Sequence, residues 1–288
     1  MSAGEQKLVV KRQVGASGPL VAIEFLSAAC ELSKSALKDA MNKGAVWLTP
    51  RRGKQRRQRQ RLRRATAQLA PGDTIELCYD PRVLAAEAPR ADLVEDRERY
   101  SIWFKPAGLL AQGTDFGDHC ALQRQVEQHY DPKRAVLLVH RLDREACGLM
   151  LVAHDAEAAA ALSALWREDR VYKRYRAQVR GDLAATRGSA GRIELPLDGK
   201  ASLSEYTVVG RDVATDVTTV DVVIHTGRLH QIRRHLEAIG FPVIGDPRYG
   251  RGNKNRDGLR LAAVAIEFVC PLRKQPAAFA LDPATLGW

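Results

Sequence analysis

Residues 136–153 read VLLVHRLDREACGLMLVA, in which two apolar runs stand on either side of a charged tetrapeptide, His140-Arg141-Leu142-Asp143. Apolar runs of this length, rich in valine and leucine, are typical of buried strands. We therefore predict that the polar residues lie on a connection held in place by two strands, where proteins often carry chemistry. An aspartate held there is costly to keep ionised unless a cation or hydrogen bonds stabilise it. The simpler interpretation is a structural ion pair of Asp143 with Arg141 or Arg144.

Length and composition indicate a globular protein of about two domains. The chain has 288 residues, of which 45% are hydrophobic and 27% are charged. No window approaches the roughly 18 uncharged apolar residues that a helix needs to span a bilayer. The start, MSAGEQKLVVKRQV, lacks the apolar core and cleavage site of a secretory signal. We therefore expect a soluble, cytoplasmic protein with no membrane partner.

The cysteines and histidines do not predict a metal site. The five cysteines are scattered, odd in number and never spaced as C-x-x-C, which argues against a disulfide framework and a zinc site. His225, His230 and His235 are five residues apart, a spacing that turns the side chain away from the original face of a helix. We expect no bound metal.

The positive charge is concentrated in one run. The formal net charge is +11, and residues 51–64 contain nine lysines or arginines and no acid. Blocks of like charge repel one another until phosphates neutralise them, so the run predicts a polyanionic partner, RNA in particular. A solvated loop and a membrane-surface segment are the alternatives. Leu62 is the single large apolar residue of the run, which disfavours the membrane.

The run lies within a small amino-terminal module. We predict helices at 20–30 and 33–43, a strand at 45–48, a turn at 71–73 and a strand at 74–79. In this order the elements resemble the small αL RNA-binding module first described in a ribosomal protein. The matching residues are Ser33-Lys34-Ser35, Gly44-Ala45-Val46 and Gly72-Asp73-Thr74-Ile75. The first helix lacks the charged residues usual at its start, and the arginine-rich stretch replaces a short loop.

This resemblance implies that the second helix and the basic loop grip an RNA backbone. The candidate RNA-binding residues are Lys34, Arg51, Arg52, Lys54, Arg56, Arg57, Arg59, Arg61, Arg63 and Arg64. Residues 81–98 show no clear periodicity. We therefore predict a small domain at 1–85, a linker at 86–98 and a second domain at 99–288.

The second domain is predicted to be rich in strands. We expect strands at 100–104, 171–179, 202–209, 217–224 and 259–268, and a helix at 156–168. Lys173 and Tyr175 alternate with polar residues and so share a strand face with apolar neighbours. A further helix is predicted to open at Thr226, with Leu229, Ile232, Leu236 and Ile239 as its buried stripe.

Four motifs in residues 99–285 together resemble the RluA-type pseudouridine synthases. They are Lys105-Pro106-Ala107-Gly108, His140-Arg141-Leu142-Asp143 followed by Gly148-Leu149, Lys173-Arg174-Tyr175-Arg176-Ala177, and the segment 227–235 with Gly245-Asp246-Pro247. The resemblance implies an α+β fold, with a central, mostly antiparallel mixed sheet flanked by helices. It also implies isomerisation of uridine in RNA to pseudouridine, with no cofactor and no metal.

The resemblance implies roles for individual residues. Asp143 would act as nucleophile or base, Arg233 would stabilise its charge, and Tyr175 would stack on the flipped-out base and assist proton movement. Arg141 could fill the space that the base vacates. The substrate-binding candidates are His140, Arg141, Lys105, Lys173, Arg228, His230, Gln231 and Arg234. Four of these residues are expected to hold phosphates or shape the cleft, namely Lys105, Arg228, His230 and Arg234.

Two departures and two alternatives remain open at this point. The family usually has Thr-Ser where Ala146-Cys147 stand, and a threonine at Leu229, so hydrogen bonds that orient the loop could be lost. A non-catalytic RNA-binding or ribosome-assembly protein on the same fold is the main alternative. A hydrolase with paired carboxylates is disfavoured, because Asp143 and Glu145 project to opposite sides of an extended segment. We expect a monomer whose partner is ribosomal RNA in preference to transfer RNA.

Overall fold

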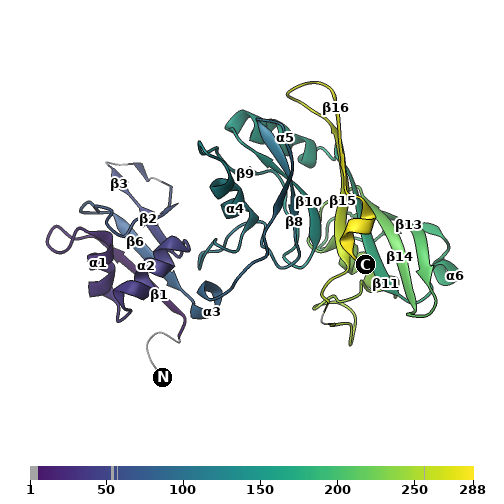
Figure 1. The fold of residues 1–288 in the computed structure, drawn as a ribbon, viewed down its shortest axis with the longest axis horizontal. Coiled ribbons are helices and arrows are strands. Elements are labelled where there is room, and N and C mark those ends of the chain that lie inside the picture. The colour runs from purple at the N-terminus through teal and green to yellow at the C-terminus, as the bar shows by residue number, and fades with distance from the viewer. Residues whose placement is uncertain (1–5, 53–54, 57, 256) are drawn as a thin grey trace. The chain divides into compact units, whose positions relative to one another are not determined.

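A computed structural model describes residues 6–52, 55–56, 58–255 and 257–288 (Figure 1). The side chains of residues 52–57 lie outside the description, as do Lys54 and Arg57 altogether. The chain forms two compact units. The first comprises Met1–Ala88 with Gln112–Gln125, and the second comprises Pro89–Ala111 with Val126–Trp288.

The first unit is a small antiparallel sheet covered by two helices. Its elements are β1 (Leu8–Gln13), α1 (Ala22–Ala29), α2 (Lys34–Asn42), β2 (Val46–Thr49), β3 (Arg51–Arg52), β4 (Gln55–Arg56), β5 (Gln60–Arg61), β6 (Thr74–Tyr79) and α3 (Pro81–Leu84). The strand order is β1-β6-β2-β5, and β3 pairs with β4. Ser33 begins α2 as predicted, because its hydroxyl accepts a hydrogen bond from the amide of Ala36 at 3.2 Å.

The second unit is built on a ten-stranded sheet within the described residues. Its strands are β7 (Asp92–Asp96), β8 (Tyr100–Lys105), β9 (Leu137–Leu138), β10 (Cys147–Ala153), β11 (Tyr172–Arg180), β12 (Ala190–Glu194), β13 (Leu203–Asp212), β14 (Val217–Ile224), β15 (Leu261–Val269) and β16 (Pro276–Ala280). The main path runs β12-β13-β14-β11-β15-β10-β8-β7, with β16 on β15 and β9 on β10. Of these pairings, β10 with β15 is parallel and the others are antiparallel. The mixed, mostly antiparallel sheet confirms the predicted fold class.

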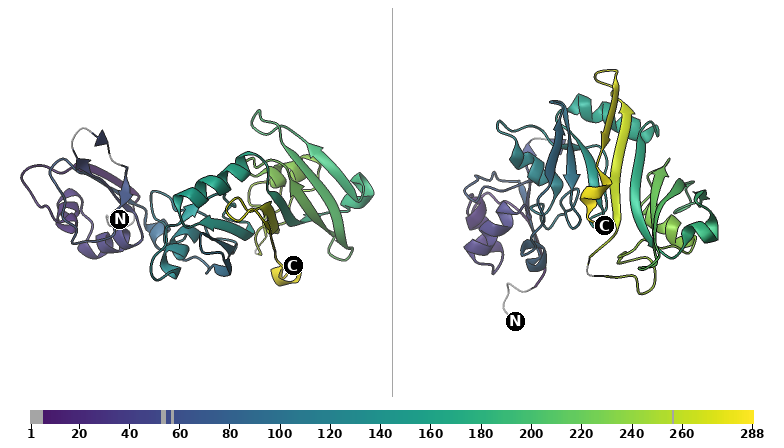
Figure 2. Two further views of the ribbon diagram at one scale, coloured as in Figure 1. Left: turned by 90° about the horizontal axis from the view of Figure 1, so that it is seen from above. Right: turned by 45° about the vertical axis from the view of Figure 1, so that its right-hand side comes forward.

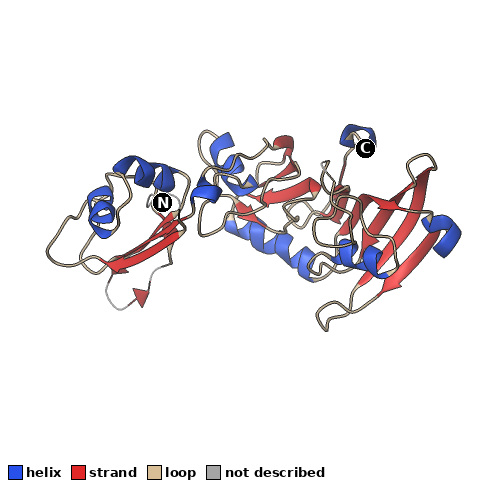
Figure 3. Cartoon of the chain, turned by 90° about the horizontal axis from the view of Figure 1, so that it is seen from below, coloured by secondary structure: helices blue, strands red, loops and turns tan. Residues whose placement is uncertain are grey.

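Helices α5 (Ala156–Arg167) and α7 (Gln231–Ala238) cover one face of this sheet. Leu162 of α5 packs with Leu149 and Ile266, whereas Leu236 of α7 packs with Ala177 and Val222. The carboxyl-terminal 3-10 turn η2 (Pro283–Leu286) packs on the other face, as Figures 2 and 3 show. Short helices α4 (Leu122–His129) and α6 (Leu183–Arg187) complete the chain. The loop that joins β9 to β10 contacts both helices. His140 stacks on Trp166 of α5, and Asp143 accepts a hydrogen bond from Arg233 of α7.

The structure corrects the predicted linker at 86–98. Residues Asp92–Asp96 form the edge strand β7, which pairs antiparallel with β8, and residues 112–125 belong to the first unit. The stretch ADLVED carries too little alternation to be recognised locally as a strand. Its partner β8 supplies the hydrogen bonds that make it one.

The helix predicted from Thr226 begins five residues later, at Gln231. The side-chain oxygen of Gln231 accepts hydrogen bonds from the Thr226 hydroxyl at 2.7 Å and from the Arg228 amide at 3.0 Å, which holds the chain in a turn. His230 then adopts a left-handed φ of 54°. As a result Leu229 is 62% exposed and does not belong to the buried stripe, whereas Ile232 and Leu236 are buried as predicted.

The close approach of β10 to β15 makes a specific demand on Gly148. Gly148 has a φ of 117°, and a Cβ there would overlap the backbone of Ala263. We expect Gly148→Ala to destabilise the protein by about 3 kcal/mol or more, because backbone strain and overlap add. Gly199→Ala is the matched control, since Gly199 also has a positive φ, 72°, but has nothing within 4 Å.

Urea denaturation of the two variants measures these costs. Strain alone predicts about 1 kcal/mol for Gly199→Ala. Equal losses in both variants would show that the approach of the two strands adds nothing at Gly148.

Candidate active site

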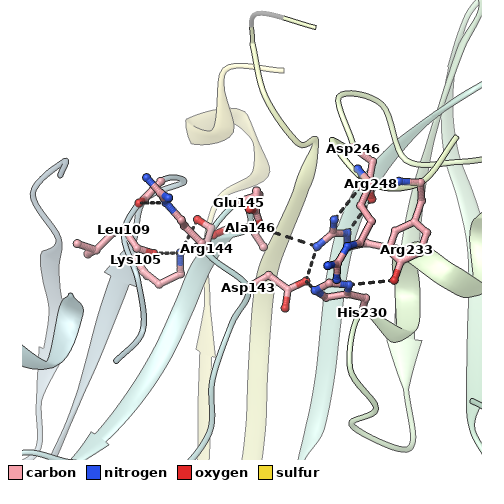
Figure 4. Close-up of polar contacts among 12 residues, drawn as sticks. Lys105, Leu109, Asp143, Arg144, Glu145, Ala146, His230, Arg233, Asp246 and Arg248 are labelled. Atoms are coloured by element: carbon pink, nitrogen blue, oxygen red, sulfur yellow. Dashed lines mark hydrogen bonds and ion pairs between the residues drawn. The ribbon is translucent and has the colours of Figure 1, made fainter. Parts of the chain in front are cut away.

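The loop at residues 139–146, between β9 and β10, is held from below by Lys105 at the end of β8. The Lys105 ammonium donates hydrogen bonds to the carbonyl oxygens of Ala146 at 2.6 Å and Leu109 at 2.8 Å, and to that of Arg144 at 3.3 Å (Figure 4). Lys105 is fully buried. Its burial lowers its pKa to about 8. Lys105, predicted to bind substrate or shape the cleft, is thus placed where it shapes the loop.

His140 supports the same loop from the side of α5. Its Nε2 accepts a hydrogen bond from the Leu151 amide at 3.0 Å, and its ring stacks on Trp166 with 4.5 Å between centroids. Burial, with a further contribution from Lys173, lowers the pKa of His140 to about 3, so the ring is neutral. His140 and Lys173 line a second small cavity beneath the loop with Trp166 and Tyr175. His140 and Lys173 were both predicted to bind substrate, but neither lines the pocket at Asp143.

Asp143 contacts two cationic or potentially cationic side chains through one oxygen. Its Oδ2 accepts a hydrogen bond from Nη1 of Arg233 at 2.9 Å and lies 3.7 Å from Nε2 of His230. None of the described residues donates a hydrogen bond to Oδ1, and Figure 4 shows that oxygen pointing away from Arg233. The side chain is 23% exposed. Asp143 is therefore anchored at one oxygen and open to a ligand at the other.

Arg233 is held by a second carboxylate, Asp246, which the sequence analysis quoted within a motif but did not name as a site residue. Asp246 accepts hydrogen bonds from Nε of Arg233 at 2.7 Å and from Nη2 at 2.8 Å, and both side chains are almost completely buried. Burial alone would lower the pKa of Arg233, but hydrogen bonds to Asp246 and Asp143 raise it. Burial likewise opposes ionisation of Asp246, yet the bonds it accepts lower its pKa. The sequence signal that could have identified Asp246 is the acid within the motif 245–247. Its partner Arg233 lies thirteen residues earlier, on α7.

A pocket opens beside Asp143. Its lining residues are Arg141, Leu142, Asp143, Ala146, Tyr175, Ile224, Gly227, Arg228, His230, Gln231, Ile232, Arg233 and Leu261. Burial, together with the nearby negative charge of Asp143, raises the pKa of the Tyr175 hydroxyl. Its phenol therefore stays protonated near neutral pH. Charged and polar side chains from the loop, from β11 and from α7 thus line the pocket together with apolar ones.

The other predicted substrate-binding residues differ in what they can reach. Arg141 is exposed, lines the pocket and has no hydrogen-bond or ion-pair partner in the part of the chain that the structure describes. Arg228 also lines it and donates to the carbonyl of Ala201 at 3.2 Å. Gln231 is buried, and its amide group serves the turn and β13. Arg234 pairs with Asp198 at 2.9 Å and does not line the pocket.

The departures from the family pattern fall at two different kinds of position. Ala146 is buried and lines the pocket, and its carbonyl oxygen holds Lys105. The Cys147 thiol lies 3.8 Å from the carbonyl oxygen of Leu261. Leu229 is exposed and is absent from the pocket lining. The loop is therefore oriented by a buried lysine through backbone groups, which does not require hydroxyls at 146 and 147.

In the first unit, part of the basic run is engaged by acids of the same unit. Arg61 and Arg63 pair with Asp118, and Arg59 pairs with Asp115 at 3.3 Å. The guanidinium groups of Arg59 and Arg61 lie 4.0 and 4.1 Å from the ring centroid of Trp47. These three arginines are thus not a solvated loop, because the segment 112–125 supplies their counterions.

The remaining RNA-binding candidates fall into three groups. Arg51 and Arg64 are exposed, and their guanidinium groups pair with no acid among the described side chains. Lys34 is exposed and pairs with Glu24 at 2.6 Å. Arg52 and Arg56 lie in β3 and β4 with only their backbone described, and Lys54 and Arg57 lie outside the described residues.

Two features are absent from the described residues. No group of three or more histidine, cysteine, aspartate or glutamate side chains there could hold a metal ion. Among the helices that the structure describes, none is long and apolar enough to cross a membrane.

Comparison with known proteins identifies the family to which this geometry belongs. Residues 99–238 match the family model described as RNA pseudouridylate synthase. The chain is 31% identical over 188 residues to the dual-specificity RNA pseudouridine synthase RluA of Vibrio vulnificus, covering 58% of this chain and 73% of that protein. It is 36% identical over 177 residues to the ribosomal large subunit pseudouridine synthase D of Pseudomonas aeruginosa. This match covers 55% of this chain and 53% of that protein.

The fold has a solved counterpart. The structure of human RNA Pseudouridylate Synthase Domain Containing 1 aligns with a TM-score of 0.58 at 22% identity. The alignment covers 68% of this chain and 85% of that one.

The buried Lys105 predicts a specific pH dependence of stability. Burial lowers its folded-state pKa from 10.5 to about 8, so between these values the unfolded chain binds more protons than the folded chain. The free energy of unfolding of wild type relative to Lys105→Met should therefore rise with pH across this window, by about 3 kcal/mol in total.

Urea melts at a series of pH values measure this difference, in which the titration of all other groups cancels. A difference that is independent of pH would mean that Lys105 titrates as it does in water.

Proposed function

The chain belongs to the RNA pseudouridine synthases of the RluA type, and on this premise we propose that Asp143 is the residue with which it converts uridine to pseudouridine. The proposal rests above all on one observation. Asp143 is anchored by a buried arginine through Oδ2, while Oδ1 accepts no hydrogen bond from the described residues. A carboxylate held in this way is oriented by a cation at one oxygen and offers the other to a substrate, and both nucleophilic and base catalysis need such orientation.

The reaction rearranges one bond without a net change of atoms. The bond between N1 and C1′ breaks, the base turns, and C5 bonds to C1′. The proton at C5 is then lost and N1 gains one. Asp143 acts with its open oxygen at the sugar or the base, and the Tyr175 phenol, protonated in its buried position, assists proton movement at C5.

The uridine must leave its stack to reach this pocket. Flipping a base out of structured RNA costs a few kcal/mol. We propose that Arg141 offsets this cost by entering the vacated stack, since its exposed guanidinium is planar and has no partner among the described residues.

We further propose ribosomal RNA as the preferred substrate over transfer RNA. Two observations support this. One relative is named a ribosomal large subunit pseudouridine synthase, and the amino-terminal unit resembles an RNA-binding module of a ribosomal protein. A further relative, from Pasteurella multocida, is named a tRNA pseudouridine synthase, which makes transfer RNA the competing substrate.

Replacement of the aspartate separates catalysis from binding. Asp143→Asn should lower the rate of pseudouridine formation by at least about 10⁴-fold, because the carboxylate is required in the reaction itself. RNA affinity should change little, since phosphate contacts dominate it. Tritium release from RNA labelled at C5 of uridine measures the first, and filter binding measures the second. Turnover by Asp143→Asn at the wild-type rate would overturn the role of Asp143, and absence of turnover in wild type would favour a non-catalytic RNA-binding protein.

Mapping of pseudouridines in total RNA tests the substrate. In cells that lack the gene, one or a few sites in ribosomal RNA should be unmodified and should return with wild type but not with Asp143→Asn. Sites lost only from transfer RNA would overturn the ribosomal preference.

The basic run makes a quantitative prediction about salt. Arg51 and Arg64 are proposed phosphate contacts, so Arg51→Gln and Arg64→Gln should each lower the slope of log K against log salt by roughly 0.7 to 0.9. Arg61→Gln is the comparison variant, because Arg61 already pairs with Asp118. Its main effect should be on the stability of the unit. An unchanged slope for the first two variants would exclude them from the RNA interface.

A further inference from the structure

We propose that the turn at residues 245–249 is a positioning element that aims two side chains at one oxygen of Asp143. Asp246 orients Arg233, Tyr249 orients His230, and both oriented groups converge on Oδ2 of Asp143. The inference rests on the proposed catalytic role of Asp143. It assigns functions to Asp246 and Tyr249 in presenting the open oxygen to the substrate.

Asp246 is not accessible to a substrate, because its side chain is completely buried and both of its oxygens are bonded within the protein. Its Oδ1 accepts hydrogen bonds from Nη2 of Arg233 at 2.8 Å and from the amides of Arg248 and Tyr249 at 2.8 and 3.0 Å. Its Oδ2 accepts one from Nε of Arg233 at 2.7 Å, and the side chain is completely buried. Asp246 is therefore a positioning residue, which acts through Arg233, and not a catalytic one.

The pair of bonds to Asp246 fixes the plane of the Arg233 guanidinium. A guanidinium is rigid and planar, so holding its Nε and Nη2 edge sets the direction of its third nitrogen. That nitrogen, Nη1, lies 2.9 Å from Oδ2 of Asp143 and 3.8 Å from Glu145, as Figure 4 shows for the labelled side chains. Without Asp246, Arg233 would be free to turn toward Glu145, which is 40% exposed.

Tyr249 makes the second connection from the same turn. Its hydroxyl lies 3.0 Å from Nδ1 of His230, which leaves Nε2 facing Asp143 at 3.7 Å. Burial lowers the pKa of His230, against the opposing effect of Asp143. Its left-handed backbone, with φ of 54°, turns it out of the helical path of α7. Tyr249 also has the Arg233 guanidinium 5.2 Å from its ring centroid.

The turn itself is well fixed. Gly245 has a φ of 75°, and a Cβ there would overlap the backbone of Gly258. The amide of Asp246 donates to the carbonyl of Val243 at 3.2 Å, and the Asn253 side chain also donates to that carbonyl. A turn constrained by its packing can hold two side chains more narrowly than a mobile loop could.

A purely structural ion pair is the competing explanation. Removing one partner of a buried pair destabilises any protein, whatever the pair does for catalysis. Asp221 provides a matched control in the same unit, because it pairs with both nitrogens of the Arg176 edge at 2.8 and 3.1 Å and also with Arg174. Asp221 is 11% exposed and does not line the pocket.

The experiment compares steady-state kinetics of tritium release for wild type, Asp143→Asn, Asp246→Asn, Tyr249→Phe, Arg233→Gln, Asp221→Asn and the double variant Arg233→Gln with Asp246→Asn. Asp246→Asn should lower kcat by about 100-fold, the scale of a small misplacement of a reacting group, with little change in KM or in RNA affinity. Tyr249→Phe should lower kcat to a smaller extent. Asp221→Asn should lower the melting temperature but leave kcat unchanged.

The double variant shows whether Asp246 acts through Arg233. If it does, adding Asp246→Asn to Arg233→Gln should cause no further loss, because effects of groups that act as a unit are not additive. Multiplied losses would overturn the proposal. So would a kcat for Asp246→Asn no lower than that of Asp221→Asn.

If Asp246→Asn does not fold at the assay temperature, Tyr249→Phe decides alone. A lowered kcat with unchanged RNA affinity supports the positioning element, and an unchanged kcat overturns it. Full activity in Asp143→Asn would instead refute the proposed function. An inactive Asp143→Asn beside a fully active Asp246→Asn would refute only the present inference.

Discussion

The ion pair between Asp143 and Arg233 connects parts of the second unit that lie 90 residues apart in the chain. Asp143 belongs to the loop before β10, near the middle of the sheet, and Arg233 belongs to α7. The pocket depends on this contact, because it fixes the loop against the helix that forms another wall. Lys105 and His140 support the same loop from beneath and from α5.

Electrostatics explains why the site carries more acids than the reaction needs. Burying a guanidinium is costly, and a single exposed carboxylate would compensate it poorly. Asp246, completely buried and bonded at both oxygens, supplies that compensation and leaves Asp143 without the task of neutralising Arg233 alone. Such a pair is weak evidence for stability, since well-packed apolar residues often replace buried pairs without loss. Because Arg233 lines the pocket and bonds to Asp143, its pair with Asp246 bears on the position of Asp143.

The basic run of the first unit shows how charge can serve two ends within one segment. Arg59 and Arg61 stack on Trp47 and pair with Asp115 and Asp118, so they hold the segment 112–125 within the unit. Their charges are largely compensated. Arg51 and Arg64, which lack an acidic partner among the described side chains, are the ones left to meet a polyanion. A count of positive charges along the sequence does not distinguish the two groups.

The sequence by itself determined strands and helix starts that depend on neighbouring residues. Alternation predicted β6, the high β propensity of its residues predicted β14, and the Ser33 cap predicted the start of α2, because each of these signals is set by residues within a few positions. The motifs also identified Asp143, Tyr175 and Arg233 as neighbours in one pocket. Tertiary structure alone decided the edge strand β7, the late start of α7, and the partnerships of Asp246 with Arg233 and of Asp118 with Arg61. Each of these depends on hydrogen bonds or charges from a segment brought close only by folding, which no local pattern records.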